Sequence, residues 1–118
     1  MMMRSALVLV AAAGFLAAPR PVQADDSVTG EVVDLACYMH MPDTGKGPGH
    51  KKCAETCLKK GLPIGIVTDD KQVFLMLEDH DNPKPYAELK DKAAAKVTVE
   101  GHKVTQGGTQ GMVVEAVK

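Results

Sequence analysis

Three cysteines and a histidine follow one another at spacings that suit a shared site in this 118-residue chain. Cys37 comes first, and His50, Cys53 and Cys57 follow at helical spacing. Because a helix turns about 100° per residue, these last three side chains would project from one stripe about 60° wide. A glycine-rich loop at residues 45–49 would allow Cys37 to approach that stripe.

This set of residue types is typical of a metal site. Three thiolates and one imidazole make a closed tetrahedral zinc site, and thiolates also suit copper(I). Met39, His40 and Met41 directly follow Cys37 and would add soft ligands for copper(I). Asp34 either hydrogen-bonds a ligand histidine and orients it, or is a plain surface acid of a strand. We therefore predict a Cys3His site for zinc or copper(I), with Met39, His40 and Met41 as additional candidates.

The odd number of cysteines leaves two alternatives open. Cys37 could form a disulfide with Cys53 or Cys57, which would contribute about 3 kcal/mol in the chain-entropy model and leave one thiol free. A redox-active thiol is the other alternative, with its pKa lowered by His50 or a lysine, although the sequence has no Cys-x-x-Cys pair. The spacings exclude c-type haem attachment and match no iron–sulfur motif.

The composition excludes several classes of protein. The formal net charge of −1 provides no basic excess for a nucleic-acid backbone. Charged residues make up 25% of the chain, too few for a disordered polymer, and the length suits one domain. There is no Ser-His-Asp order, nucleophile elbow or phosphate loop. These features favour a binding protein over an enzyme. The partners expected for it are a metal ion and a second periplasmic protein.

The first 24 residues have the pattern of a secretory signal peptide. Arg4 provides the positive start, residues 6–18 form an apolar run, and Val22 and Ala24 are small residues before a cleavage point. The run is too short for a membrane anchor, which needs about 20 apolar residues. Cleavage after Ala24 would leave residues 25–118 as a single periplasmic domain with no stable membrane insertion. That domain would have 12 lysines, 15 acidic residues and a net charge of −3.

The mature chain predicts a mainly β fold with two short helices. Alternating and β-branched stretches indicate five strands, and two stretches of helix formers indicate helices. The strands are expected at residues 27–36, 63–68, 72–77, 96–104 and 111–117, and the helices at 50–60 and 86–95. This order is that of a small five-stranded OB-like barrel, with the helical Cys/His insert between the first two strands. Because a chain this short buries only a modest core, a metal or a cross-link would matter for its stability.

Several motifs carry a resemblance to other proteins. They are GEVVDLACY at residues 30–38, His50-x-x-Cys53-Ala54-x-x-Cys57, and Gly61-x-Pro63-Ile64-Gly65. With EDHDNPKPY and KVTVEG further on, the sequence resembles a group of small, uncharacterised exported bacterial proteins. The resemblance implies export and an OB-like fold, and implies no activity. The strand pattern is also similar to that of the periplasmic copper-binding OB family, but the tryptophan of that family is missing and cysteines replace its methionines.

Overall fold

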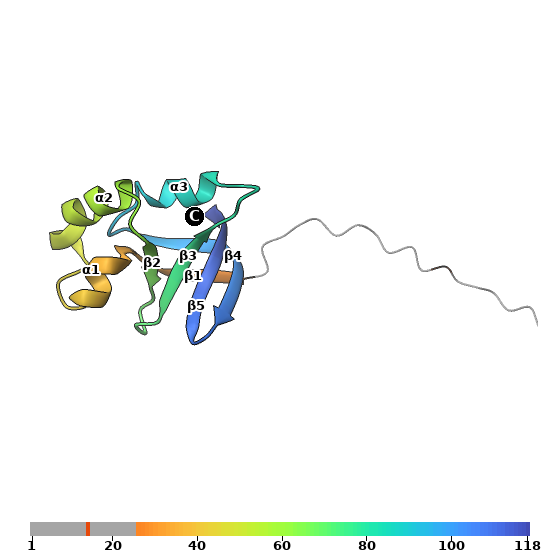
Figure 1. The fold of residues 1–118 in the computed structure, drawn as a ribbon, viewed down its shortest axis with the longest axis horizontal. Helices are drawn as coiled ribbons and strands as arrows, with labels where there is room; N and C mark the ends of the chain where they lie inside the picture. The colour runs from red at the N-terminus through yellow and green to blue at the C-terminus, as the bar shows by residue number, and fades with distance from the viewer. Residues whose placement is uncertain (1–13, 15–25) are drawn as a thin grey trace, which may run out of the picture.

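The computed structural model describes residue 14 and residues 26–118, so the predicted signal peptide at residues 1–24 lies almost entirely outside the described part. Five strands close into a barrel in the order β1-β2-β3-β5-β4 (Figure 1). The strands are β1 (Asp26–Asp34), β2 (Ile64–Val67), β3 (Val73–Glu78), β4 (Lys96–Gln106) and β5 (Thr109–Val117). The predicted five-stranded OB-like barrel is therefore confirmed, with each strand close to its expected position.

Strand β1 closes the barrel because it pairs with two neighbours. Residues 26–31 pair with β4 and residues 31–34 pair with β2, in both cases antiparallel. Gly30 lies next to the change of partner, where a Cβ atom would collide with the carbonyl of Val67, so a residue without a side chain is needed there. The parallel pairing of β3 with β5 completes the ring and leaves no unpaired sheet edge between them.

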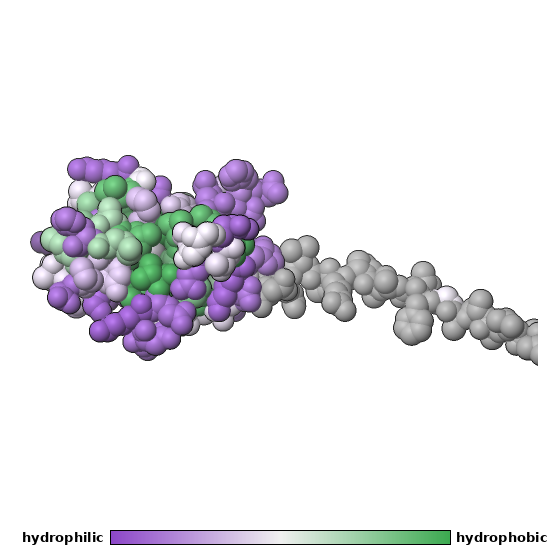
Figure 2. Space-filling model, turned by 60° about the horizontal axis from the view of Figure 1, so that its bottom comes forward, coloured by the Kyte–Doolittle hydropathy of each residue, from purple (hydrophilic) through white to green (hydrophobic). Residues whose placement is uncertain are grey.

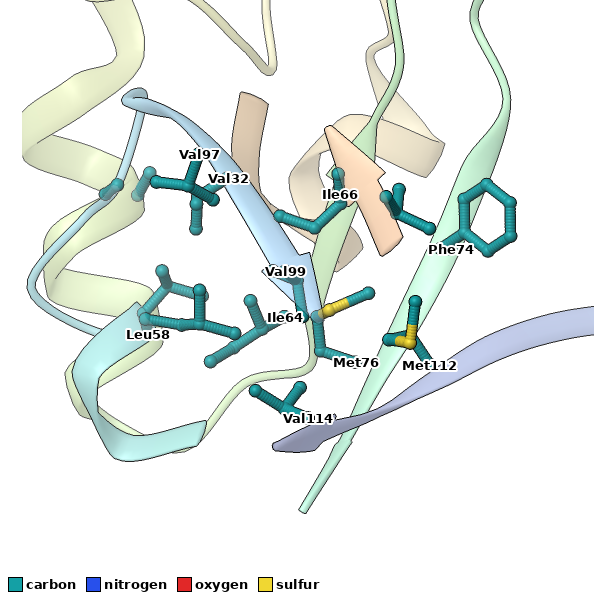
Figure 3. Packing of buried hydrophobic residues seen from close by; sticks show 14 residues of the cluster. Val32, Leu58, Ile64, Ile66, Phe74, Met76, Val97, Val99, Met112 and Val114 are labelled. Atoms are coloured by element: carbon teal, nitrogen blue, oxygen red, sulfur yellow. The ribbon is translucent and has the colours of Figure 1, made fainter. Parts of the chain in front are cut away.

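Apolar side chains from all five strands fill the barrel (Figure 3). Leu58 and Leu89 join this cluster from two helices, and both are fully buried. The labelled members of the cluster in Figure 3 are Val32, Leu58, Ile64, Ile66, Phe74, Met76, Val97, Val99, Met112 and Val114. The helices are thus held to the barrel by its core and not only by the chain connections.

Four short helical segments within the described residues pack against the barrel. They are α1 (Leu35–His40), the 3-10 turn η1 (Pro48–His50), α2 (Lys51–Lys59) and α3 (Lys84–Leu89). The first three form the insert between β1 and β2, at the end of the barrel away from the point where the chain enters β1 (Figure 1). The insert predicted between the first two strands is confirmed, but it contains a helix, α1, that the sequence did not suggest.

The extra helix corrects the predicted end of the first strand. That strand was expected to reach Ala36, yet β1 ends at Asp34 and the chain turns at once into α1. The Asp34 carboxylate Oδ1 accepts hydrogen bonds from the amides of Ala36 at 3.0 Å and Cys37 at 3.4 Å. This is an N-cap, which starts a helix by satisfying its first free amides. Cys37 therefore lies on a helix, and not at the end of a strand.

Helix α3 is shorter than predicted. The sequence suggested residues 86–95, whereas the helix ends at Leu89. Its alanine-rich continuation is drawn to β1 instead: the amide of Ala94 donates to the carbonyl of Val32, and the amide of Val32 donates to the carbonyl of Ala95, both at 2.9 Å. Tertiary pairing with the barrel here outweighs the helix propensity of alanine.

The end of α2 matches its sequence signal. Gly61 has a φ of 92°, and its amide donates to the carbonyl of Leu58 at 3.0 Å. The amide of Leu62 donates to the carbonyl of Cys57 at 3.1 Å, which completes a Schellman motif. The glycine predicted just beyond the helix is therefore the residue that ends it.

Apolar side chains also gather on one outer face. In Figure 2 this face shows a hydrophobic area surrounded by hydrophilic residues. A groove lies between α1 and the strands β3 and β5, and Leu35, Met39, Val73 and Leu75 provide its apolar lining. No helix within the described residues is both long and apolar enough to cross a membrane.

Leu58→Ala tests the attachment of α2 to the core. Leu58 is fully buried, so we expect the metal-free protein to lose about 2–5 kcal/mol of unfolding free energy in urea. Val104→Ala is the control, because Val104 is 39% exposed and its loss should cost far less. Equal losses in the two variants would contradict the packing described for α2.

Candidate metal centre

The predicted metal ligands meet where α1 faces α2. The donor atoms of Cys37, His50 and Cys53 all lie within 4.8 Å of one another. A second group joins Asp34, Cys37 and Cys57 within the same limit. Cys37 belongs to both groups. The structure thus brings the four predicted ligands and Asp34 into one cluster, whose geometry is compatible with metal binding.

Tyr38 positions the first of these ligands. Its side chain is buried against Val33 and Val67 on the outside of the barrel, which fixes the rotation of α1. Cys37 is the preceding residue and therefore projects about 100° away from that contact. The helix continues to His40, and the amide of its C-cap residue, Met41, donates to the carbonyl of Cys37 at 2.8 Å.

The loop after α1 folds back closely over it. The amide of Gly45 donates to the carbonyl of Met41 at 2.7 Å. A Cβ atom on Gly45 would lie only 2.7 Å from the carbonyl oxygen of Cys37, so glycine is required. The Glu31 carboxylate accepts a hydrogen bond from the amide of Gly47 at 2.7 Å and ties the loop to β1. The glycine-rich loop thus brings His50 back toward Cys37, as the sequence suggested.

Helix α2 is oriented by its contact with the core. Ala54 and Leu58 are buried in the barrel cluster. Cys53 and Cys57 each precede one of them, so they lie on a stripe about 100° around the helix from the buried one. His50 is the residue before α2 and extends the cysteine stripe. Burial of one stripe therefore directs the other toward α1.

Two buried polar atoms in this cluster lack hydrogen-bond partners. They are Oδ2 of Asp34 and Nε2 of His50, both within the described residues. Asp34 has no exposed surface at all, while its other oxygen caps α1. Buried polar atoms are nearly always partnered in folded proteins, because an unpaired one costs about 1–3 kcal/mol. Two such atoms in one cluster with three thiols are compatible with metal binding.

The carboxylate and the thiols shift one another's pKa values. Burial acts to raise the pKa of Asp34, but the approach of the Cys37 and Cys57 thiols, with two backbone amides, lowers it overall. Donation to Asp34, followed by burial and by the charge of the carboxylate, raises the pKa of Cys37 to about 12. The same causes raise the pKa of Cys57.

These shifts keep the metal-free thiols of Cys37 and Cys57 protonated. A thiol is a weak donor, so its approach lowers the pKa of Asp34 while Oδ2 still lacks a hydrogen bond of acceptable geometry. All three cysteines are free thiols in the structure. A cation that binds here must displace thiol protons, so its affinity falls as the pH is lowered.

The additional candidates are exposed side chains. His40 is exposed and belongs to neither donor group. Met39 is 67% exposed and lines the apolar groove, and Met41 is 44% exposed. Of the three candidates that follow Cys37, His40 therefore lies outside both donor groups, and Met39 contributes to the groove.

The surroundings of Asp34 differ from those predicted from the sequence. It was expected either to orient a ligand histidine or to be a plain surface acid of a strand. The structure buries it and places its carboxylate within 4.8 Å of the Cys37 and Cys57 sulfurs. A signal was present in the sequence, since Asp34 precedes Cys37 at the spacing of an N-cap. This spacing indicates an N-cap only if a helix is expected to begin directly after Asp34.

Comparisons with known proteins assign this chain to no family. The scan against protein-family models and the searches of curated proteins and of solved structures each found no match. The chemistry of the site therefore rests on its own residues.

Asp34→Asn tests the coupling between the carboxylate and Cys37. Asparagine caps helices as well as aspartate does, so α1 should persist. Loss of the negative charge should lower the pKa of Cys37 and raise its thiolate fraction about tenfold per pKa unit. We expect faster alkylation of Cys37 by iodoacetamide at pH 8 in reduced, chelator-treated protein, measured by peptide mass spectrometry.

Asp43→Asn is the matched control, because Asp43 is an exposed acid in the same insert. In the Asp43→Asn variant, Cys37 should be alkylated at the same rate as in the protein without a substitution. An unchanged rate in Asp34→Asn would show that Asp34 does not control the thiol.

Proposed function

We propose that this protein is an exported, periplasmic metal-binding protein whose cluster binds zinc or copper(I) through Cys37, His50, Cys53 and Cys57. The observation that carries this proposal is the convergence of donors from separate segments on Cys37, within 4.8 Å. Local spacing explains why His50, Cys53 and Cys57 lie on one side of α2, but it does not explain why that side faces Cys37. A fold that brings soft donors from distant segments together, with no disulfide between the cysteines, suits a metal ion.

The exposure of the cluster supports a role in metal handling. Cys53 is exposed, and Cys37 and Cys57 are partly exposed, so an ion can reach them from solvent. An ion bound there would also join α1 to α2 and stabilise an insert that has few core residues of its own. The cluster therefore suits a protein that carries or senses metal and is stabilised by it.

The remaining parts of the proposal rest on the sequence. Export follows from the signal-peptide pattern of residues 1–24 and from the resemblance to small exported proteins. The partner is the metal ion, together with a periplasmic protein that supplies or receives it, and the acidic balance of the mature chain argues against nucleic acid. A set of four protein ligands favours binding over catalysis, because a catalytic zinc keeps one position open.

The second candidate is a thiol-redox or disulfide-stapled binding module. It is favoured by the same distances, because the Cys37 sulfur is near those of Cys53 and Cys57. Oxidation of such a pair would join α1 to α2 covalently and leave the third cysteine as a thiol.

Mass spectrometry distinguishes the two candidates. We expect protein purified from the periplasm, without chelator or nickel affinity, to carry a zinc or copper adduct under native conditions. After denaturation, all three cysteines should react with an alkylating reagent. A mass lower by two hydrogens, with a single alkylated cysteine and no adduct, would establish the disulfide and overturn the proposal.

His50→Ala tests the imidazole ligand. Loss of one of four ligands should weaken metal binding at least tenfold in a competition titration against a chromophoric chelator. His80→Ala is the control, because His80 is exposed and lies in neither donor group. Unchanged affinity in His50→Ala with a loss in His40→Ala would move the histidine ligand to residue 40.

A further inference from the structure

The division of the donors into two groups has a simple explanation. We propose that the cluster binds two divalent ions, bridged by the sulfur of Cys37. The first ion is held by Cys37, His50 and Cys53, and the second by Cys37, Cys57 and Asp34. This inference rests on the proposed metal-binding function and changes both its stoichiometry and its ligand set.

The distances separate Cys57 from the first group. In a tetrahedral site with bonds of 2.0–2.3 Å, all donor pairs lie about 3.5–3.8 Å apart. Among the described residues, the donors form two groups of three, and His50, Cys53 and Cys57 do not join Cys37 in one group of four. Cys37 is the residue shared by the two groups. A thiolate has the lone pairs to bind two ions, so it can serve both.

Each group also contains one residue with an unpartnered buried atom. His50, with its unpartnered Nε2, belongs to the first group, and Asp34, with its unpartnered Oδ2, to the second. A single ion bound by three cysteines and His50 would leave the buried oxygen of Asp34 without a partner. Two ions give every residue of the cluster a bond, and Asp34 then becomes a ligand.

Charge balance favours the same arrangement. Three thiolates and one carboxylate carry four negative charges, and a metal-bound histidine is neutral. One divalent ion would leave the cluster with a net charge of −2, the fully buried carboxylate included, which is costly without compensation. None of the described lysines forms an ion pair with Asp34. Two divalent ions balance the four charges.

The donor types favour zinc over copper(I). Zinc accepts sulfur, nitrogen and carboxylate oxygen, whereas copper(I) selects sulfur, and a carboxylate suits it poorly. With three protein donors each, both zinc ions would keep one position for water or an incoming ligand. That open position provides a route by which an ion could pass to a partner protein.

Zinc titration with native mass spectrometry tests the stoichiometry. Reduced, metal-free mature protein should bind two zinc ions at saturation. With ¹¹³Cd²⁺ as the probe, the same protein should show two cadmium resonances of different shift. One bound ion would overturn the two-ion cluster while leaving the proposed function intact, and no bound zinc or cadmium would overturn the two-ion cluster and the zinc site together.

Variants separate the two positions. Asp34→Asn should lose one ion and one cadmium resonance, and Cys57→Ser should do the same without altering the helix cap. Asp43→Asn should keep two ions, because Asp43 lies outside the cluster. Retention of both ions in Asp34→Asn and in Cys57→Ser would overturn the assignment of the second ion. If Asp34→Asn does not fold, Cys57→Ser decides the result.

Discussion

The buried carboxylate of Asp34 is the constraint on which the arrangement of this protein depends. One oxygen caps α1 and so ends β1, which turns the chain sharply at the rim of the barrel. The other oxygen has no hydrogen bond of its own, and the thiols of Cys37 and Cys57 lie close to the carboxylate. A carboxylate with no exposed surface requires compensation from its surroundings. The cap provides part of it, and a cation at the cluster would provide the rest.

The barrel acts on the site through rotation of the helices. Tyr38 packs on the outside of the barrel and Leu58 packs into its core, so each helix can take only one orientation. The cysteines are neighbours of these anchors in sequence and are directed by them. The site is therefore built from residues that do not contribute to the core, on helices whose positions the core determines. Such an arrangement allows the ligands to remain partly exposed while the scaffold is stable.

Sequence reasoning was successful where the signals were local. The strand order, the helix around Cys53 and its glycine stop at Gly61 follow from periodicity and turn chemistry, and the structure confirms them. It was wrong where tertiary contacts compete with local preference. The end of α3 is an example, because Ala94 and Ala95 leave a helix-favouring stretch to pair with Val32. The start of α1 is another, since β-branched residues before it suggested a longer strand.

The sequence alone determined which donor types are available, because thiols and an imidazole at helical spacing can be recognised without coordinates. It also determined that Cys53 and Cys57 share a stripe with His50, since helix geometry is regular. Only the tertiary structure decided that Cys37 lies between two donor groups and that Asp34 is one of the donors. The reason is that the depth and orientation of a side chain depend on long-range packing. Asp34 is buried by contacts with segments far from it in the chain, and no local pattern records them.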